Sequence, residues 1–398
     1  MDMVKERQRS PPKRQNIKEK EGEGESDACR DRLSNLPDNL IHHILSFMDT
    51  IYAVRTSVLS RRWRHLWTSI PCLSFDVDIM HFATPDEPEI YEGEWDHFMD
   101  LVDEILIRRD GSDIRKFRFR DDDVDFLSKV NRLERALWYA VRHNVQELQL
   151  EINGDGFEFP PCIFSCESLR TLELNPRLQC MDFYNPMGFV GLKTMYLCCF
   201  NFEENTSGDP FSTCPVLENL VLEHCCFPPT EVFSISALQL TNLVILNPIK
   251  NRTCPSPKMM ISAPRLTSFK YESCVTLNFN FQNLCSIDKV DINLCPFERS
   301  RPNIGEDFCV IPQELAGMLK GLRNAKDVVL SFLALQVLST LSGLESEPSP
   351  FCNLKSLRLR HNHNDIITYL IKDSPSFETM VVDHPRLKLE NTGEHGCC

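Results

Sequence analysis

The sequence lacks the segments that would direct it into a membrane or along the secretory path. Its 398 residues contain no apolar run of about eighteen residues, so we expect no transmembrane helix. Residues 1–30 carry 8 basic and 7 acidic side chains and no apolar signal segment, so we expect a disordered, charged N-terminal tail. We therefore expect a cytoplasmic or nuclear protein, or one found in both compartments.

The motifs of common catalytic and cofactor-binding sites are also missing. The chain has no G-x-S-x-G, no G-x-x-x-x-G-K-[ST], no H-E-x-x-H and no G-x-G-x-x-G. Its 18 cysteines form no C-x-x-C pair and no spacing typical of zinc, so we expect free thiols in a reducing compartment. We expect His361 and His363 to be solvated. The sequence thus predicts no catalytic residue, no cofactor and no metal site.

Positive charge is scarce beyond the first seventy residues. The whole chain has a formal net charge of −14, whereas residues 71–398 hold 30 basic and 47 acidic side chains, a net charge of −17. The electrostatic field of this negative charge repels nucleic acids and anionic membranes, and it tolerates a basic protein partner.

Residues 31–70, by contrast, are dense in apolar helical patterns. Pro37 suits the first turn of a helix, because its missing N–H would have no partner there. Apolar residues then recur at every fourth position from Leu36 to Met48, and further patterns follow at 53–59 and 63–70. A unit this short exposes much of its apolar surface unless something covers it. The block therefore predicts three short helices that dock onto a partner.

This block closely resembles the F-box, in particular its plant form. Residues 31–37 read DRLSNLP and residues 53–67 read AVRTSVLSRRWRHLW, which match the two ends of that motif almost letter for letter. Asp49 and Ile51 depart from the family, which commonly has Pro and Lys there, so we expect an altered turn between the helices. The resemblance implies a surface for a Skp-type adaptor, some of whose residues also hold the helices together: Leu36, Pro37, Leu40, Ile41, Ile44, Leu45, Val54, Val58, Leu59, Trp63, Leu66 and Trp67.

From residue 114 the chain repeats the pattern L-x-x-L-x-L, with other apolar residues as substitutes. The copies begin at residues 114, 145, 169, 192, 217, 240, 266, 287, 325, 354 and 377. Most of these spacings are typical of leucine-rich repeats, whereas the gaps of 31 and 38 residues predict insertions on the outer face or an irregular repeat. Each copy predicts a short strand, and stacked strands can share one core.

The patterns predict an α/β fold in which a small three-helix F-box precedes a curved leucine-rich-repeat solenoid with a parallel β-sheet on its concave face. The phrase CPVLENLVLEHC resembles plant F-box/LRR-repeat proteins, although the FBD extension of many relatives is not evident. The predicted parts are a charged tail at 1–30, the F-box at 31–77, an acidic loop and connecting helix at 78–113, the solenoid at 114–383 and a C-terminal tail at 384–398.

Three cysteines occupy one offset in the repeats. Cys225, Cys274 and Cys295 each lie three residues after the last apolar strand residue, where a small buried thiol suits a tight turn. We expect them to be structural and slow to react.

Strand alternation predicts which side chains face away from the core. The second and third apolar residues of each L-x-x-L-x-L copy point inward, so their neighbours point outward. The outward face is basic at both ends and mainly acidic or mixed between them. We expect it to bind substrate through Arg118, Arg120, Glu173, Asn175, Tyr196, Glu223, Lys270, Glu272, Asp291, Asn293, Arg358 and Arg360.

The resemblance implies a substrate-recognition adaptor of an SCF-type cullin–RING E3 ubiquitin ligase. The F-box would bind a Skp-type adaptor, which links it to the cullin and RING subunits, and the solenoid would hold an unknown protein substrate. One alternative is an LRR receptor that senses a small molecule, although the negative charge disfavours an anionic ligand. Another is an LRR scaffold without ligase coupling.

Overall fold

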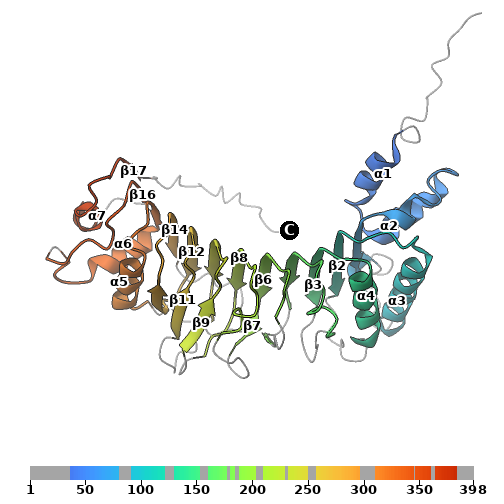
Figure 1. The fold of residues 1–398 in the computed structure, drawn as a ribbon, viewed down its shortest axis with the longest axis horizontal. Helices are drawn as coiled ribbons and strands as arrows, with labels where there is room; N and C mark the ends of the chain where they lie inside the picture. The colour runs from blue at the N-terminus through green and yellow to red at the C-terminus, as the bar shows by residue number, and fades with distance from the viewer. Residues whose placement is uncertain are drawn as a thin grey trace, which may run out of the picture.

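The computed structural model describes residues 36–79, 91–121, 130–152, 160–176, 180–183, 188–202, 209–228, 232–249, 257–295, 310–344, 346–359 and 364–382. An elongated, curved molecule is built around one parallel sheet (Figure 1). No helix in these ranges is both long enough and apolar enough to cross a membrane. Along the sheet the 12 strands are β1 (Cys72–Asp76), β2 (Lys116–Asp121), β3 (Glu147–Ile152), β4 (Thr171–Leu174), β6 (Thr194–Cys198), β8 (Asn219–Glu223), β10 (Asn242–Leu246), β12 (Ser268–Ser273), β14 (Lys289–Leu294), β15 (Asp327–Leu330), β16 (Ser356–Leu359) and β17 (Thr379–Val382).

Parallel pairing brings equivalent residues of successive repeats side by side. Phe117 pairs with Leu148 and Phe119 with Leu150, and the same register continues through the last strand pair. These inward residues belong to one apolar core, which no single strand could cover alone. The predicted α/β solenoid with its parallel sheet on the concave side is therefore confirmed.

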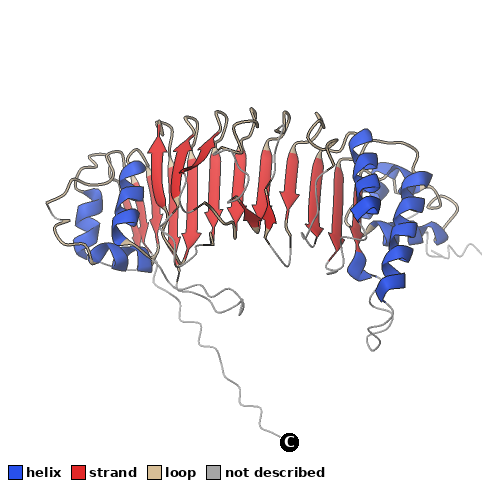
Figure 2. Ribbon diagram, turned by 90° about the horizontal axis from the view of Figure 1, so that it is seen from below, coloured by secondary structure: helices blue, strands red, loops and turns tan. Residues whose placement is uncertain are grey.

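The opposite, convex side carries short strands in the middle and helices towards both ends (Figure 2). The two long gaps between repeats contain α4 (Val130–Arg142) and α5 (Pro312–Gly321), so extra residues there do form outer elements. Further helices are α3 (Tyr91–Arg108), α6 (Phe332–Ser339) and α7 (Asn364–Ile371). The short strands are β5 (Met181–Asp182) paired with β7 (Phe200–Asn201), and a sheet of β9 (Val232–Ser236), β11 (Lys258–Ser262) and β13 (Asn278–Gln282).

Over residues 36–77, the part of the F-box segment that the structure describes, there are two α-helices rather than three. After α1 (Asp38–Leu45) and α2 (Thr50–Arg55) come only 3₁₀ turns, η1 (Thr56–Val58) and η2 (Leu66–Ser69), so the predicted third helix is wrong. Hydrogen bonds there span three residues, as from the Thr68 amide to the His65 carbonyl at 3.1 Å. Trp63 and Trp67 are nevertheless both buried in the core.

The F-box is continuous with the solenoid. Ile41 and Trp63 lie in the same apolar cluster as Phe75 of β1 and Phe117 of β2. Because β1 pairs with β2, the sheet starts inside the segment predicted as F-box, one strand before the predicted start at residue 114. The region 31–77 thus contributes both a docking unit and the first strand of the sheet.

Candidate functional site

Helix α1 is apolar on two sides, and only one of them is covered. Ile41 and Leu45 are 0% and 1% exposed and face the core. Leu40 and Ile44 are 45% and 41% exposed, and Phe47, just beyond the helix, is 77% exposed. Positions separated by four and three residues lie on one helical face, so these three side chains form an outward apolar line. The His43 ring stacks edge-on against Phe47 with 4.8 Å between centroids.

The segment after α2 adds to this exposed apolar surface. Val58 and Leu59, at the end of η1, are 86% and 64% exposed, and Tyr52 of α2 is partly open to solvent. Large exposed apolar groups in so short a segment are typical of surfaces that bind another protein. We call Leu40, Ile44, Phe47, Tyr52, Val58 and Leu59 the F-box ridge.

The structure separates the predicted adaptor-binding residues into three groups. Ile41, Leu45, Trp63 and Trp67 are buried and form the internal core of the F-box, so they stabilise the surface rather than form it. Leu36, Val54 and Leu66 are partly buried against that core. The remaining predicted residues are exposed: Pro37, Leu40, Ile44, Val58 and Leu59.

Sequence reasoning missed Phe47 and Tyr52. The helical spacing that revealed Leu40 and Ile44 also reaches Phe47, three positions further on, and this signal was available in the sequence. Tyr52 could not be found in this way. Its exposure depends on how α2 packs, with Ile51 and Ala53 facing the core and the Arg55 guanidinium lying 5.3 Å from the Tyr52 ring centroid.

Side chains at the start of α2 hold the F-box against the edge of the sheet. The Asp49 side chain caps α2 by accepting a hydrogen bond from the Ile51 amide at 2.9 Å, and its second oxygen accepts one from the Asp76 amide at 3.1 Å. Next to it, Thr50 Oγ1 accepts a hydrogen bond from the Ser74 amide at 2.8 Å. Burial raises the pKa of the Asp49 carboxyl to about 7.

A buried arginine fixes the other side of this junction. Arg109, just after α3, is 7% exposed and donates to the Ile70 carbonyl at 2.8 Å and to the Ser112 carbonyl at 3.1 Å. It therefore ties the end of the F-box to the loop that leads into β2. Burial lowers the pKa of the Arg109 guanidinium.

The concave face of the sheet carries the residues predicted to contact substrate. Phe117 and Phe119 are fully buried, and the arginines that follow each of them point away from the core. Arg360 lies outside the described residues, and Arg358 is exposed. The others are partly exposed on the concave side or directly at its strand ends: Arg118, Arg120, Glu173, Asn175, Tyr196, Glu223, Lys270, Glu272, Asp291 and Asn293.

Ion pairs neutralise the end of this face that was predicted to be basic. Arg118 bonds Glu151 on the next strand at 2.8 Å. Arg120 lies 3.0 Å from the Asp78 carboxylate and 3.5 Å from that of Asp76. The expected basic character near the F-box is therefore corrected, because Glu151 of β3 lies beside Arg118, and Asp76 of β1, which pairs in register with Arg120, lies beside that arginine.

In the middle of the sheet the polar groups also interact with each other. The Tyr196 hydroxyl donates to the Glu223 carboxylate across two strands. Partial burial, followed by this hydrogen bond, raises the pKa of Tyr196. Lys270 and Glu272, two residues apart on β12, pair at 3.0 Å.

Comparison with known proteins identifies both parts of this arrangement. A sequence model of the F-box domain matches residues 33–75, and a model described as "FBD-associated F-box protein At5g56370, LRR repeats" matches residues 133–278. The chain thus combines an F-box domain with leucine-rich repeats, the arrangement found in the plant F-box/LRR-repeat family. Members of this family generally serve as substrate adaptors of SCF ubiquitin ligases.

Similar proteins come from Arabidopsis thaliana. The putative F-box/LRR-repeat protein At3g18150 is 29% identical over 365 residues, which cover 90% of this chain and 71% of the relative. F-box/LRR-repeat protein At4g14103 is 29% identical over 367 residues, which cover 88% of this chain and 91% of the relative. F-box/FBD/LRR-repeat protein At5g22660 is 28% identical over 381 residues, covering 88% and 76%.

The two departures from the F-box motif have structural roles in this chain. Asp49 caps α2 and bonds β1, and Ile51 is 5% exposed in the shared core. The turn between α1 and α2 is thus adapted to the contact with the solenoid. Neither residue belongs to the F-box ridge.

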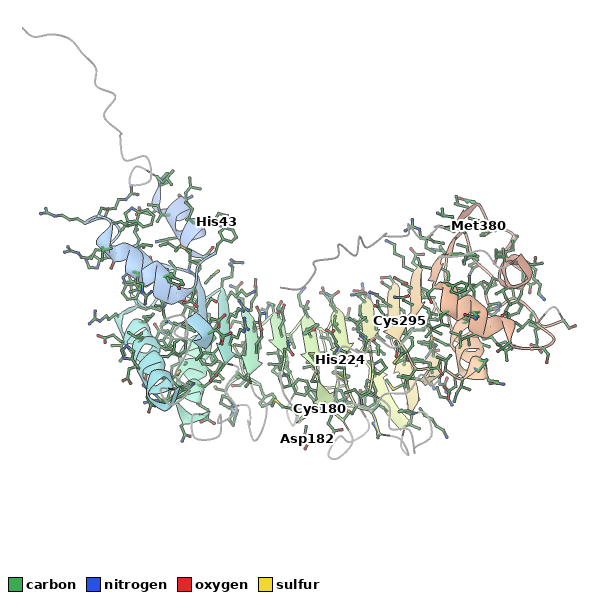
Figure 3. The ribbon with its side chains drawn as sticks, turned by 180° about the vertical axis from the view of Figure 1, so that it is seen from behind. His43, Cys180, Asp182, His224, Cys295 and Met380 are labelled. Carbon is green, nitrogen blue, oxygen red and sulfur yellow. The ribbon has the colours of Figure 1, made fainter. Side chains whose placement is uncertain are left out.

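The cysteines described by the structure are all free thiols. Cys225 and Cys274 are buried, whereas Cys295 is only partly buried, so the predicted burial is wrong for that repeat. Figure 3 shows Cys180 and Asp182 on the convex side, away from His224 and Cys295. Hydrogen bonds to Cys199 and Cys226, and then burial, raise the pKa of the Cys180 thiol. His361 and His363 lie outside the described residues.

Proposed function

We propose that this chain is the substrate-recognition adaptor of an SCF-type cullin–RING E3 ubiquitin ligase. The observation that carries the proposal is the F-box ridge, whose large apolar side chains stay exposed although the rest of the F-box packs into a continuous core. The F-box projects from one end of the solenoid (Figure 1), apart from the middle strands of the concave face.

The solenoid holds the substrate in this proposal. Its concave face presents side chains from 12 aligned strands, and the net charge of −17 over residues 71–398 favours a basic protein partner. The F-box binds the Skp-type adaptor at one end of the chain, and the sheet holds the substrate. Together these contacts raise the effective concentration of substrate lysines near the enzyme that carries ubiquitin. The chain itself supplies no reacting group, and it acts in the cytoplasm, the nucleus or both.

Adaptor capture from plant extract tests the proposal. The test variant replaces three ridge residues (Leu40→Ser, Ile44→Ser, Phe47→Ser). The control replaces three exposed apolar residues of the solenoid, which are 62%, 47% and 70% exposed (Val190→Ser, Val232→Ser, Leu238→Ser). Buried aromatic or aliphatic anchors each contribute about 2 kcal/mol or more, so losing one weakens binding roughly thirtyfold.

We expect the wild type and the control to recover a Skp-type adaptor and a cullin, and the ridge variant to recover neither. Failure of the wild type to recover them would contradict the ligase proposal. Equal recovery by the ridge variant would show that another surface binds the adaptor. Trp63 is unsuitable for this test because it is buried, so its replacement would report on folding.

A further inference from the structure

The middle of the concave sheet breaks the alternation of apolar and polar residues. Between its two core residues, each of the strands β2, β3, β4, β12 and β14 presents a polar side chain outward. On β8 and β10 the same position holds Val221 and Val244, and β10 adds Leu246 at its next outward position. Tyr196 holds this position on β6. We call Tyr196, Val221, Val244 and Leu246 the central strip.

Strand register makes the central strip continuous. Tyr196 pairs with Val221, and Val221 pairs with Val244. None of the four residues is needed to fill the core, because the inward residues of β8 and β10 are already fully buried. Water-facing positions of a sheet are normally polar, so a run of apolar side chains across neighbouring strands marks a surface for a partner.

Carboxylates border the strip. Glu173 of β4 pairs in register with Tyr196, and Glu223 of β8 pairs with Leu246. Strands β4, β6, β8 and β10 contain no Lys or Arg. Lys270 of β12 is the first cation beyond Val244, and it is already paired with Glu272. The field at the strip is therefore negative and suits a basic partner.

We propose that the central strip binds an extended segment of the substrate that presents apolar side chains and Lys or Arg on one side, at every second residue. The apolar side chains cover Val221 and Val244, and the basic ones reach Glu173 and Glu223. Neighbouring strands lie about 4.8 Å apart, so the path from β4 to β12 is about 19 Å long, the reach of about six extended residues. This inference rests on the proposed function, because it describes the substrate that the ligase would hold.

Selection from a phage-displayed library of random twelve-residue peptides tests the inference on the full chain. One variant reverses the charge beside the strip (Glu173→Lys, Glu223→Lys). A second replaces two valines by the isosteric, strand-compatible threonine (Val221→Thr, Val244→Thr). The control makes the same charge change at two exposed residues outside the strands (Glu167→Lys, Glu378→Lys). Circular dichroism establishes that each variant is folded.

We expect the wild type to select peptides in which apolar residues and Lys or Arg occupy every second position. Their Kd should rise about tenfold or more on both strip variants and stay unchanged on the control. Selected peptides that are acidic, peptides that bind the strip variants equally well, or a failure to select any peptide would overturn the inference.

Recovery of the Skp-type adaptor from plant extract tests the proposed function independently of peptide binding to the central strip. Both strip variants should still recover a Skp-type adaptor from plant extract, since the F-box ridge is unchanged in them. If the wild type recovers no adaptor while the peptide result holds, the proposed function fails and the central strip remains a peptide-binding surface. If adaptor recovery is normal and the peptide result fails, only the inference is overturned.

Discussion

The carboxylate of Asp49 accepts a hydrogen bond from the backbone amide of Asp76 at 3.1 Å, and this contact joins the F-box to the first strand of the solenoid sheet. The outer edge of β1 would otherwise present unpaired amides, which attract other strands. Thr50 satisfies the Ser74 amide in the same way at 2.8 Å. The F-box thus caps the edge of the sheet, and its orientation relative to the substrate face is set by side chains rather than by a flexible linker.

Loss of the Asp49 side chain should destabilise this junction. Asp49→Ala removes the cap of α2 and leaves the Asp76 amide without its partner, which together cost about 2–3 kcal/mol of unfolding free energy. Denaturant unfolding measures the loss, and Asp38→Ala, which removes an exposed ion pair with Arg62, should cost less than about 1 kcal/mol. Hydrogen exchange should accelerate at the Asp76 amide in Asp49→Ala and at the Ser74 amide in Thr50→Val. Unchanged hydrogen exchange at both amides would contradict the conclusion that Asp49 and Thr50 cap the edge of the sheet.

The raised pKa of Asp49 predicts a pH dependence of stability. Because burial raises its pKa from 3.8 to about 7, the folded state holds this proton more tightly than the unfolded state does. The Asp49 contribution is therefore most favourable below about pH 4 and is lost as the pH rises to about 7. Asn stays neutral, so unfolding free energy should fall less steeply between pH 4 and pH 7 in Asp49→Asn than in the wild type. Asp38→Asn is the control, and parallel profiles for Asp49→Asn and the wild type would refute the assignment.

Arg109 should contribute far more to the free energy of unfolding than its neighbour Arg108. Arg109→Met keeps the length of the side chain but leaves the carbonyls of Ile70 and Ser112 without their donor, which should cost about 2–3 kcal/mol. Arg108 is exposed and pairs with Glu104 one helical turn away, so Arg108→Met should cost less than about 1 kcal/mol. Thermal unfolding of the two variants compares these costs directly, and equal costs would show that Arg109 is not a structural clamp.

Thiol reactivity should follow burial. Burial raises the pKa of Cys225, which also donates weakly to the Leu197 carbonyl with Sγ at 3.6 Å from the oxygen. Alkylation of native protein kept from air oxidation, read by mass spectrometry, should modify exposed Cys285 well before buried Cys225. A native disulfide at Cys225 or Cys274 would contradict the structural role of these thiols.

The repeat strands were predictable because each depends on a local pattern. Two inward residues, such as Leu148 and Leu150, are enough to predict a strand and the face that it buries, and stacking then aligns the copies. The conformation of the turns after the strands was harder to predict from the sequence. Cys199, His224 and Asn247 occupy equivalent positions and share positive φ angles of 56°, 50° and 45°. Asparagine and, to a lesser degree, histidine favour that conformation but cysteine does not, so the stacking of repeats imposes it at Cys199.

The candidate docking surfaces were only partly predictable from the sequence, because burial and ion pairing depend on how the elements pack. Periodicity reveals that α1 is apolar over a wide stripe, but only the packed structure shows that Ile41 is covered and Leu40 is not. On the concave face, alternation predicts that Arg118 points outward, whereas its pairing with Glu151 depends on the register between β2 and β3. The apolar outward residues Val221 and Val244 were visible in the sequence and were missed because polar residues were sought there.

Hydroxyl-radical footprinting with a purified Skp-type adaptor tests the central claim most directly. The method reports solvent exposure of individual side chains by mass spectrometry. Adaptor binding should protect Leu40, Ile44, Phe47 and Leu59, which are 45%, 41%, 77% and 64% exposed in the free chain. Tyr196 and Leu246 on the concave face should react as before. Absence of a complex, or protection of the concave face while the ridge stays reactive, would contradict a ligase adaptor that docks through its F-box.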